Sequence, residues 1–251
     1  MLSNSPSFFF SGVLTLLIAF TVHEFAHAWT ATQFGDDTPR LYGRLTLNPI
    51  AHLDLLGSLM LIFAGFGWAK SVPVNPSKLR QSSPSALMFV ALSGPLSNFL
   101  LAALAAIPLR FGWVVPTGAQ ISLLPTPYQF LTYFLFTNLG LMMFNLIPLP
   151  PLDGEEILEF LLPASWQERW YRIKPYGPYI LLGLFILGPM IGFNLVDVLI
   201  SPIVQKLASF LLGGRFWLCK RLAEWVLFTV ICWNARMVLS TAAGRLIFTT
   251  A

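Results

Sequence analysis

The chain has 251 residues, of which 56% are hydrophobic and 10% are charged, and its formal net charge is +4. Soluble domains carry about 25% charged residues. This chain therefore has too little polar sequence to cover a soluble core, and its mean hydropathy of +0.71 indicates a membrane protein. The basic residues are scattered between apolar segments and match no nucleic-acid-binding motif, so we expect no nucleic-acid partner.

The first predicted membrane span covers residues 8–34 and carries "TVHEFAHAW" in its C-terminal half. We expect it to be retained rather than cleaved as a signal peptide, because it holds the motif "HEFAH". The next stretch, "GDDTPRLYGRLTLNP", has turn residues at both ends and an alternating "RLTL", which predicts a short β element. Residues 52–68 are apolar but short, contain glycines and have basic residues on both flanks. This favours a re-entrant hairpin, with a plain transmembrane helix as the alternative.

Three further apolar segments, residues 84–108, 128–147 and 176–200, are predicted to cross the membrane. The sequence thus predicts an all-α polytopic membrane protein with about four to six transmembrane helices. If the first span runs from outside to inside, the basic connections lie on the cytoplasmic side. We expect a membrane-embedded domain over residues 1–202 and a tail over 203–251. For that tail an interfacial amphipathic helix is favoured over another crossing.

The motif "HEFAH" carries the most informative polar residues of the chain. Positions i and i+4 share one face of a helix, so His23 and His27 can bind one metal ion together. Glu24 is rotated by about 100° from His23 and can reach a water beside the metal without being a ligand. The alternative is a set of helix-packing side chains. An unpaired glutamate at mid-bilayer costs about 2.5–3.5 kcal/mol, so we favour the metal site.

A catalytic zinc site needs a third protein ligand as well as an open position. Asp153 is the favoured candidate, because it follows three prolines and precedes Gly154 in "NLIPLPPLDG" at the end of a long span. Such a segment departs from regular helix and can aim a carboxylate at a buried site. The alternative for Asp153 is a helix N-cap. The other possible ligands are His52, Asp54 and Asp197.

The sequence as a whole resembles the site-2 protease family of intramembrane zinc metalloproteases, in a short form without PDZ or CBS domain. The resemblance rests on "HEFAH", "GRLTLNP", "HLDLLGS", "GWAKSVPVNP", "SGPLSNF" and "FNLIPLPPLDG", which occur in the family's order over residues 12–154. It implies that His23, His27 and Asp153 bind one Zn²⁺ per chain and that Glu24 is the catalytic glutamate.

The resemblance also suggests residues that contact the substrate. It implies that Gly94 and Asn98 line the site and that Asn145 lies near the bound peptide. Two of these residues can instead have a purely structural role. Gly94 can serve close helix packing, and Asn98 can form an interhelical hydrogen bond. In the short members of the family, the "GRLTLNP" region is expected to be extended and to pair with substrate.

The function implied is an intramembrane zinc metalloendopeptidase that cleaves transmembrane or membrane-proximal segments of membrane proteins. The short form of the family implies a bacterial plasma membrane, and the distribution of basic residues favours an N-terminus outside and an active site nearer the cytoplasmic side. The alternatives are a non-catalytic membrane scaffold and a metal-binding or transport protein. A prenyl-protein endopeptidase is disfavoured, because that class uses a glutamate as its distal ligand. The sequence leaves the substrate and the oligomeric state open.

Overall fold

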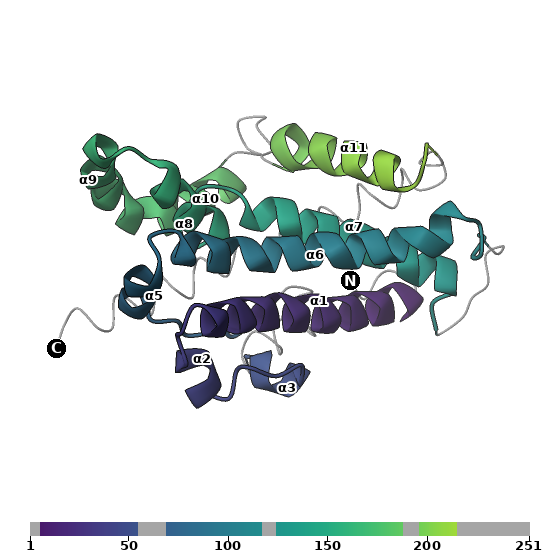
Figure 1. Cartoon of the computed structure of the whole chain (residues 1–251). Helices are drawn as coiled ribbons and strands as arrows, with labels where there is room; N and C mark the ends of the chain where they lie inside the picture. The colour runs from purple at the N-terminus through teal and green to yellow at the C-terminus, as the bar shows by residue number, and fades with distance from the viewer. Residues whose placement is uncertain (1–5, 55–68, 117–123, 188–195, 215–251) are drawn as a thin grey trace.

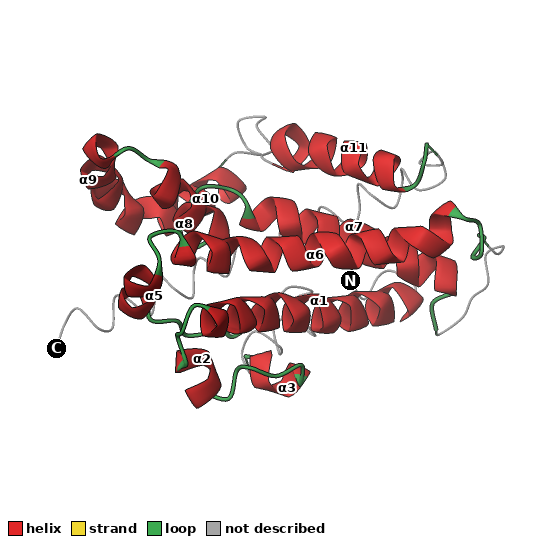
Figure 2. Cartoon of the chain, in the orientation of Figure 1, coloured by secondary structure: helices red, strands yellow, loops and turns green. Residues whose placement is uncertain are grey.

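The computed structural model describes residues 6–54, 69–116, 124–187 and 196–214. Regular structure in these residues is helical, and they contain no strand (Figure 2). The elements are, in chain order, α1 (Pro6–Gln33), α2 (Thr38–Leu41), α3 (Pro49–His52), α5 (Pro76–Ser82), α6 (Ala86–Arg110), α7 (Pro127–Asn145), α8 (Asp153–Leu161), α9 (Ala164–Ile173), the 3₁₀-helix η1 (Lys174–Tyr176), α10 (Gly177–Ile186), the π-helix η3 (Val196–Ile200) and α11 (Ser201–Leu211).

Helices α1, α6 and α7 lie side by side and form the centre of the molecule (Figure 1). Three small residues of α6, Ala102, Ala105 and Ala106, are buried in this core. Small side chains let helix backbones approach closely. Large side chains of α7 belong to the same core, and Phe136 and Phe144 are fully buried.

Helix α7 is the most enclosed of the three, because α1, α6 and α11 all pack against it. Its middle carries three polar residues, Thr132, Thr137 and Asn138, and each of them is 0% exposed. Polar groups in a membrane span ordinarily face the protein interior. The burial of α7 between other helices therefore explains how an apolar helix tolerates an asparagine in its middle.

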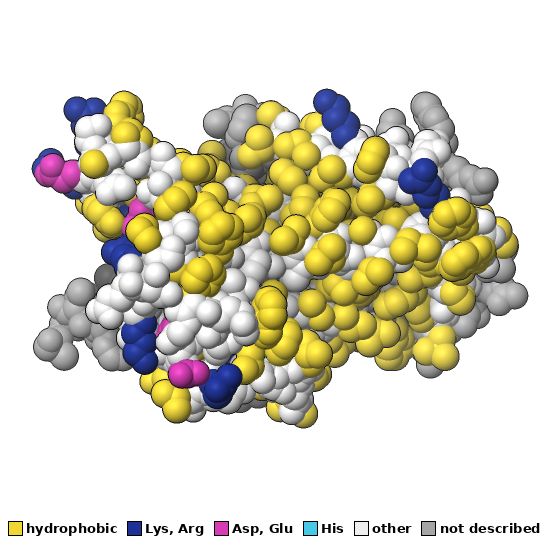
Figure 3. Space-filling view, in the orientation of Figure 1, with side chains coloured by type: hydrophobic (Ala, Val, Ile, Leu, Met, Phe, Trp, Pro, Cys, Tyr) yellow, Lys and Arg dark blue, Asp and Glu magenta, His cyan; other side chains and the backbone are white. Residues whose placement is uncertain are grey.

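Two described helices are long and apolar enough to cross a membrane, namely Phe9–Gln33 within α1 and Ala86–Arg110, with 25 residues each. Such a helix is about 37 Å long, more than the roughly 30 Å hydrocarbon core of a bilayer. Hydrophobic side chains cover the broad face along these helices, and charged ones gather toward the ends (Figure 3). The predicted count of about four to six spans is not confirmed by two helices and stays a prediction.

The predicted β element is not confirmed either. Residues 43–48 form turns and bends, and an isolated antiparallel bridge joins Leu53 to Ala69. The Arg44 guanidinium fastens this region by donating to the carbonyl oxygens of Ala51 and Lys70. The segment predicted to be re-entrant lies almost wholly outside the described residues, as does most of the tail. The described start of that tail belongs to α11, which packs on α7.

Asp36 holds the end of α1 against the start of α5. Its Oδ1 accepts hydrogen bonds from the backbone N–H and hydroxyl of Thr38, at 3.1 and 2.5 Å. Its Oδ2 accepts from the Asn75 N–H at 2.6 Å. Burial by itself would raise the pKa of Asp36, but these hydrogen bonds hold that pKa below its ordinary value. The Asp36 carboxylate, with both oxygens hydrogen-bonded, therefore anchors the segment after α1 to the start of α5.

Asp36→Ala is expected to lower the free energy of unfolding by about 3 kcal/mol, because it removes hydrogen bonds to a charged, buried acceptor. Because the folded-state pKa is depressed, this stabilisation is present at neutral pH. It is lost as the pH falls below the ordinary carboxyl pKa of about 3.9. Thermal unfolding in detergent over a pH series measures both effects. The control is Asp37→Ala, since Asp37 is exposed and its pair with Arg40 is a surface one. Equal melting temperatures for the two variants would contradict the anchor.

Candidate metal centre

The two histidines of "HEFAH" direct their Nε2 atoms toward each other. The Nε2 atoms of His23 and His27 are 3.0 Å apart, and both residues are at most 9% exposed. On the far side of each ring, Nδ1 has a hydrogen-bond partner, which is Asn98 Oδ1 for His23 at 2.6 Å and the Val90 carbonyl for His27 at 2.7 Å. Both partner oxygens only accept, so each Nδ1 carries the hydrogen and each Nε2 presents a lone pair.

Asp153 brings a carboxylate to the same spot from the first residue of α8. Its Oδ2 lies 3.2 Å from His23 Nε2, and its Oδ1 lies 3.4 Å from His27 Nε2. The buried Oδ2 has no hydrogen-bond partner among the described residues. The position depends on Gly154, since a Cβ there would lie 2.4 Å from the Leu146 carbonyl oxygen. Only glycine lets α8 begin so close to the end of α7.

Three lone-pair donors that face one another need a cation between them. Zinc binds imidazole nitrogen and carboxylate oxygen at about 2.0–2.2 Å in tetrahedral geometry, which places two ligand atoms about 3.4 Å apart. The three separations given above lie near this value. The described His, Asp and Glu residues form this His–His–Asp group with all ligand atoms within 4.8 Å of one another. The donor set, its spacing and the unpartnered carboxylate oxygen therefore fit zinc.

Gly94 of α6 lets the two imidazoles lie directly against the backbone of α6. A Cβ at this position would lie 2.4 Å from His27 Nε2 and 2.6 Å from His23 Nε2. Contacts that short do not occur between real side chains, so a larger residue here would have to displace the histidines. The sequence places Gly94 near the site, and the geometry gives the reason that no side chain fits.

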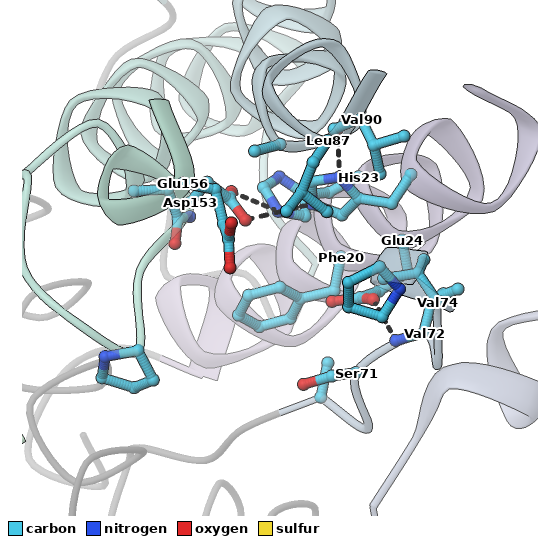
Figure 4. Close-up of a pocket in the computed structure, with 16 residues that line it drawn as sticks. Phe20, His23, Glu24, Ser71, Val72, Val74, Leu87, Val90, Asp153 and Glu156 are labelled. Carbon is cyan, nitrogen blue, oxygen red and sulfur yellow. Dashed lines mark hydrogen bonds and ion pairs between the residues drawn. The ribbon is translucent and has the colours of Figure 1, made fainter. Parts of the chain in front are cut away.

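The three donors line a cavity of about 220 Å³ that also contains Glu24 and Asn145. Glu24 is 6% exposed, and its Oε2 accepts a hydrogen bond from the Val72 N–H at 2.9 Å. Asp153 lies on one side of the cavity and Glu24 on another, beside Val72 and Val74 (Figure 4). The Asn145 amide donates to the Leu141 carbonyl at 3.0 Å. The cavity thus places two acidic side chains outside the donor set, Glu24 and Glu156, beside the donor set itself.

The other ligand candidates do not join this group. His52 is 1% exposed and its Nε2 is hydrogen-bonded to the Thr46 carbonyl at 2.8 Å, so it belongs to the 44–54 loop region. Asp54 and Asp197 are also absent from the group that His23, His27 and Asp153 form. Of the four candidates for the third ligand, the structure brings Asp153 to the histidines.

A second acidic group lies on α8, where Glu155, Glu156 and Glu159 have carboxylate oxygens close together. Its cations are side chains of the protein. Lys174 Nζ lies 2.6 Å from Glu155 and 3.0 Å from Glu159, and Arg80 lies 2.8 Å from Glu159. Burial alone would lower the pKa of Lys174, but these carboxylates raise it. We therefore interpret this group as an ion-pair network that ties α5, α8 and η1 together.

Sequence reasoning missed Asn138. Its side chain is 0% exposed and is hydrogen-bonded to Asn98, which in turn contacts His23. The available signal was an asparagine in the middle of the apolar run "FLFTNLGLMMF", where a polar side chain is costly unless it has a partner. The identity of that partner depends on how α6 and α7 pack, which sequence alone does not give.

The donor set can be compared with known proteins. A model of peptidase family M50 matches residues 11–124, which contain His23 and His27 of the donor set. The chain is 38% identical over 212 residues to the Bacillus subtilis protein named "Putative zinc metalloprotease YwhC", which covers 78% of this chain and 93% of that protein. The chain belongs to peptidase family M50, the site-2 proteases.

This site-2 protease also resembles two mycobacterial proteins named "Putative zinc metalloprotease Rip2". It is 32% identical over 225 residues to the one from Mycobacterium tuberculosis, covering 83% of both chains. It is 33% identical over 188 residues to the one from Mycolicibacterium smegmatis, covering 70% of this chain and 68% of the other. No solved structure matches the chain. The resemblance found in the motifs is confirmed, and zinc is the cofactor.

Proposed function

We propose that the chain is an intramembrane zinc metalloendopeptidase that cleaves transmembrane or membrane-proximal segments of membrane proteins. The observation that carries the proposal is the convergence of His23, His27 and Asp153, from helices 126 residues apart (Asp153 less His27), in a cavity that Glu24 also lines. The family and the names of the relatives support a membrane metalloprotease.

In the proposed reaction, His23, His27 and Asp153 would hold the zinc ion, which would supply Lewis-acid polarisation of the scissile carbonyl and of a water molecule. Glu24 takes a proton from that water as it attacks, and then gives the proton to the leaving amine. Gly94 and Asn145 lie beside the bound peptide in this proposal, and both border the histidines or the cavity. The substrate helix must unwind locally, because a helical amide is shielded by its own hydrogen bonds.

We also propose the orientation of the protein in a bacterial plasma membrane. Most described basic residues belong to segments near the end of the molecule where α1 stops and α6 begins (Figures 1 and 3). They are Arg40, Arg44, Lys70, Lys78, Arg80, Arg169, Arg172 and Lys174. Basic residues favour the cytoplasmic side. We therefore propose that the N-terminus lies outside and the metal centre nearer the cytoplasm, in a protein of about four to six spans.

Metal content tests the proposed ligands. We expect about one zinc per chain in detergent-purified protein, and loss of that zinc in both His23→Ala and Asp153→Ala. His52→Ala is the matched control, since it removes a buried imidazole that is not in the donor set. It should keep the metal. Zinc retained in Asp153→Ala would remove this residue from the site, and a wild type that takes up no zinc would overturn the proposal as a whole.

A further inference from the structure

A continuous chain of hydrogen bonds runs from the backbone of α7 to the imidazole of His23. Asn138 Nδ2 donates to the Phe134 carbonyl oxygen at 2.9 Å. Asn98 Nδ2 donates to Asn138 Oδ1 at 2.9 Å, and Asn98 Oδ1 faces His23 Nδ1 at 2.6 Å. Both asparagines are 0% exposed, so water cannot replace any of these partners.

The chain can be satisfied in only one direction. A backbone carbonyl only accepts, so the amide nitrogen of Asn138 must face Phe134 and its oxygen must face Asn98. Asn98 must then turn its nitrogen toward Asn138 and its oxygen toward His23. That oxygen requires a hydrogen on His23 Nδ1, which leaves the lone pair on Nε2, the atom that faces Asp153.

Asn98 alone would not fix this arrangement. A primary amide has a donor side and an acceptor side, and by rotating it can satisfy either tautomer of a neighbouring imidazole. Only the Asn138 oxygen, itself fixed by Phe134, removes that freedom. His27 needs no such relay, because its Nδ1 bonds directly to the Val90 carbonyl. The orientation of each imidazole is therefore set by a backbone carbonyl, which His27 contacts directly and His23 reaches through Asn98 and Asn138.

We propose that Asn138 is a positioning residue for the zinc site, which acts through Asn98 to hold His23 in the tautomer that binds metal. The proposal rests on the proposed function, since it assumes that His23 is a zinc ligand. It also assigns Asn98 to the support of His23 rather than to substrate contact, because both ends of its amide are already engaged. Partners of this kind typically contribute 10–100-fold to metal affinity.

The first test is the zinc dissociation constant of purified protein, measured by competition with a chelator. Asn138→Leu should weaken zinc binding by about 10–100-fold. Asn138→Ala is made alongside it, because it removes the amide without asking the core to accept a branched side chain. Thr132→Val is the control for a polar-to-apolar change, since Thr132 is equally buried on α7 and does not belong to the relay. It should bind zinc as the wild type does.

A rescue variant separates positioning from general loosening of the core. The rescue variant is Asn98→Asp/Asn138→Leu. A carboxylate only accepts hydrogen bonds, so the carboxylate introduced at position 98 requires a hydrogen on His23 Nδ1 even when no side chain of α7 orients it. Zinc affinity should return to within about threefold of the wild type, against the 10–100-fold loss in Asn138→Leu. No rescue, or an unchanged affinity in both Asn138→Leu and Asn138→Ala, would overturn the role of Asn138.

A metal-free measurement distinguishes this inference from the proposed function. The chain has 3 histidines, so the imidazole ¹⁵N signals of zinc-free protein can be assigned. His23 should be protonated at Nδ1 in the wild type and populate both tautomers in Asn138→Leu. If the wild type binds no zinc but its His23 tautomer still changes on the Asn138→Leu substitution, the proposed function would be overturned and the relay would stand. A wild type that binds zinc, with no shift in the variant, would overturn the relay alone.

Discussion

Glu24→Gln is expected to abolish peptide-bond cleavage while the protein keeps its zinc. A glutamine oxygen can still accept the hydrogen bond from Val72 that Glu24 accepts at 2.9 Å, so the fold and the donor set should persist. The side chain can no longer take a proton from water. General acid–base catalysis contributes about 10²–10⁴-fold, and we expect a loss of at least this size. Cleavage of a membrane-protein substrate in liposomes and elemental analysis of the same preparation measure the two properties separately.

The control for this variant is Glu168→Gln, which alters an exposed carboxylate of α9 that pairs with Arg172 on the surface. It should cleave substrate at the wild-type rate. If Glu24→Gln retained wild-type cleavage, Glu24 could not be the proton carrier. If it lost its zinc along with its activity, the carboxylate would have to be reassigned to metal binding.

Gly94→Ala is expected to remove zinc and activity together. Its Cβ would lie 2.4–2.6 Å from the Nε2 atoms of His23 and His27, and neither ring can retreat without breaking its bond to Asn98 or Val90. We expect zinc affinity to fall by at least about 100-fold, the upper end of the effect of disturbing ligand orientation. Chelator competition measures it, and thermal unfolding of the zinc-free protein shows whether the fold survives.

Gly183→Ala is the matched control, because this glycine also lies within a helix and a Cβ added there would meet nothing within 4 Å. Alanine is the better helix former by about 1 kcal/mol, so this variant should be at least as stable as the wild type and should bind zinc normally. Normal zinc binding in Gly94→Ala would show that the helices can separate at this point. The close approach of α6 to α1 would then not be a requirement of the site.

The pair His23 and His27 could be predicted from sequence because the relevant geometry is local. A helix places residues i and i+4 on one face whatever surrounds it, and the apolar composition around the pair indicated a membrane protein. The "DG" motif named Asp153, but sequence left His52, Asp54 and Asp197 open as ligands. The close approach of Gly154 to the Leu146 and Ile147 carbonyls lets α8 start where Asp153 meets the histidines, a placement that sequence alone could not give.

The segment "RLTL", which was predicted to be extended, shows where local patterns were insufficient. Alternation describes which side chains can share a face, but a strand exists only when another segment pairs with it. In the described residues, Arg44 instead fastens this loop to carbonyl oxygens of the following segments. The number of spans also depends on tertiary packing. Helix α7 is enclosed by other helices, so its polar residues can lie in the membrane interior, and their polarity does not exclude α7 as a span.

The sequence by itself therefore determined the class of protein, the histidine pair and the acidic residue beside it, since each depends on composition or on contacts within one helical turn. The tertiary structure decided the rest. It brought Asp153 to the histidines and showed that position 94 has no room for a side chain beside the imidazoles. It also joined Asn138 to His23 through Asn98 across three helices. These contacts link residues 40 or more positions apart, and a hydrogen bond at such separation is set by helix packing rather than by any local pattern.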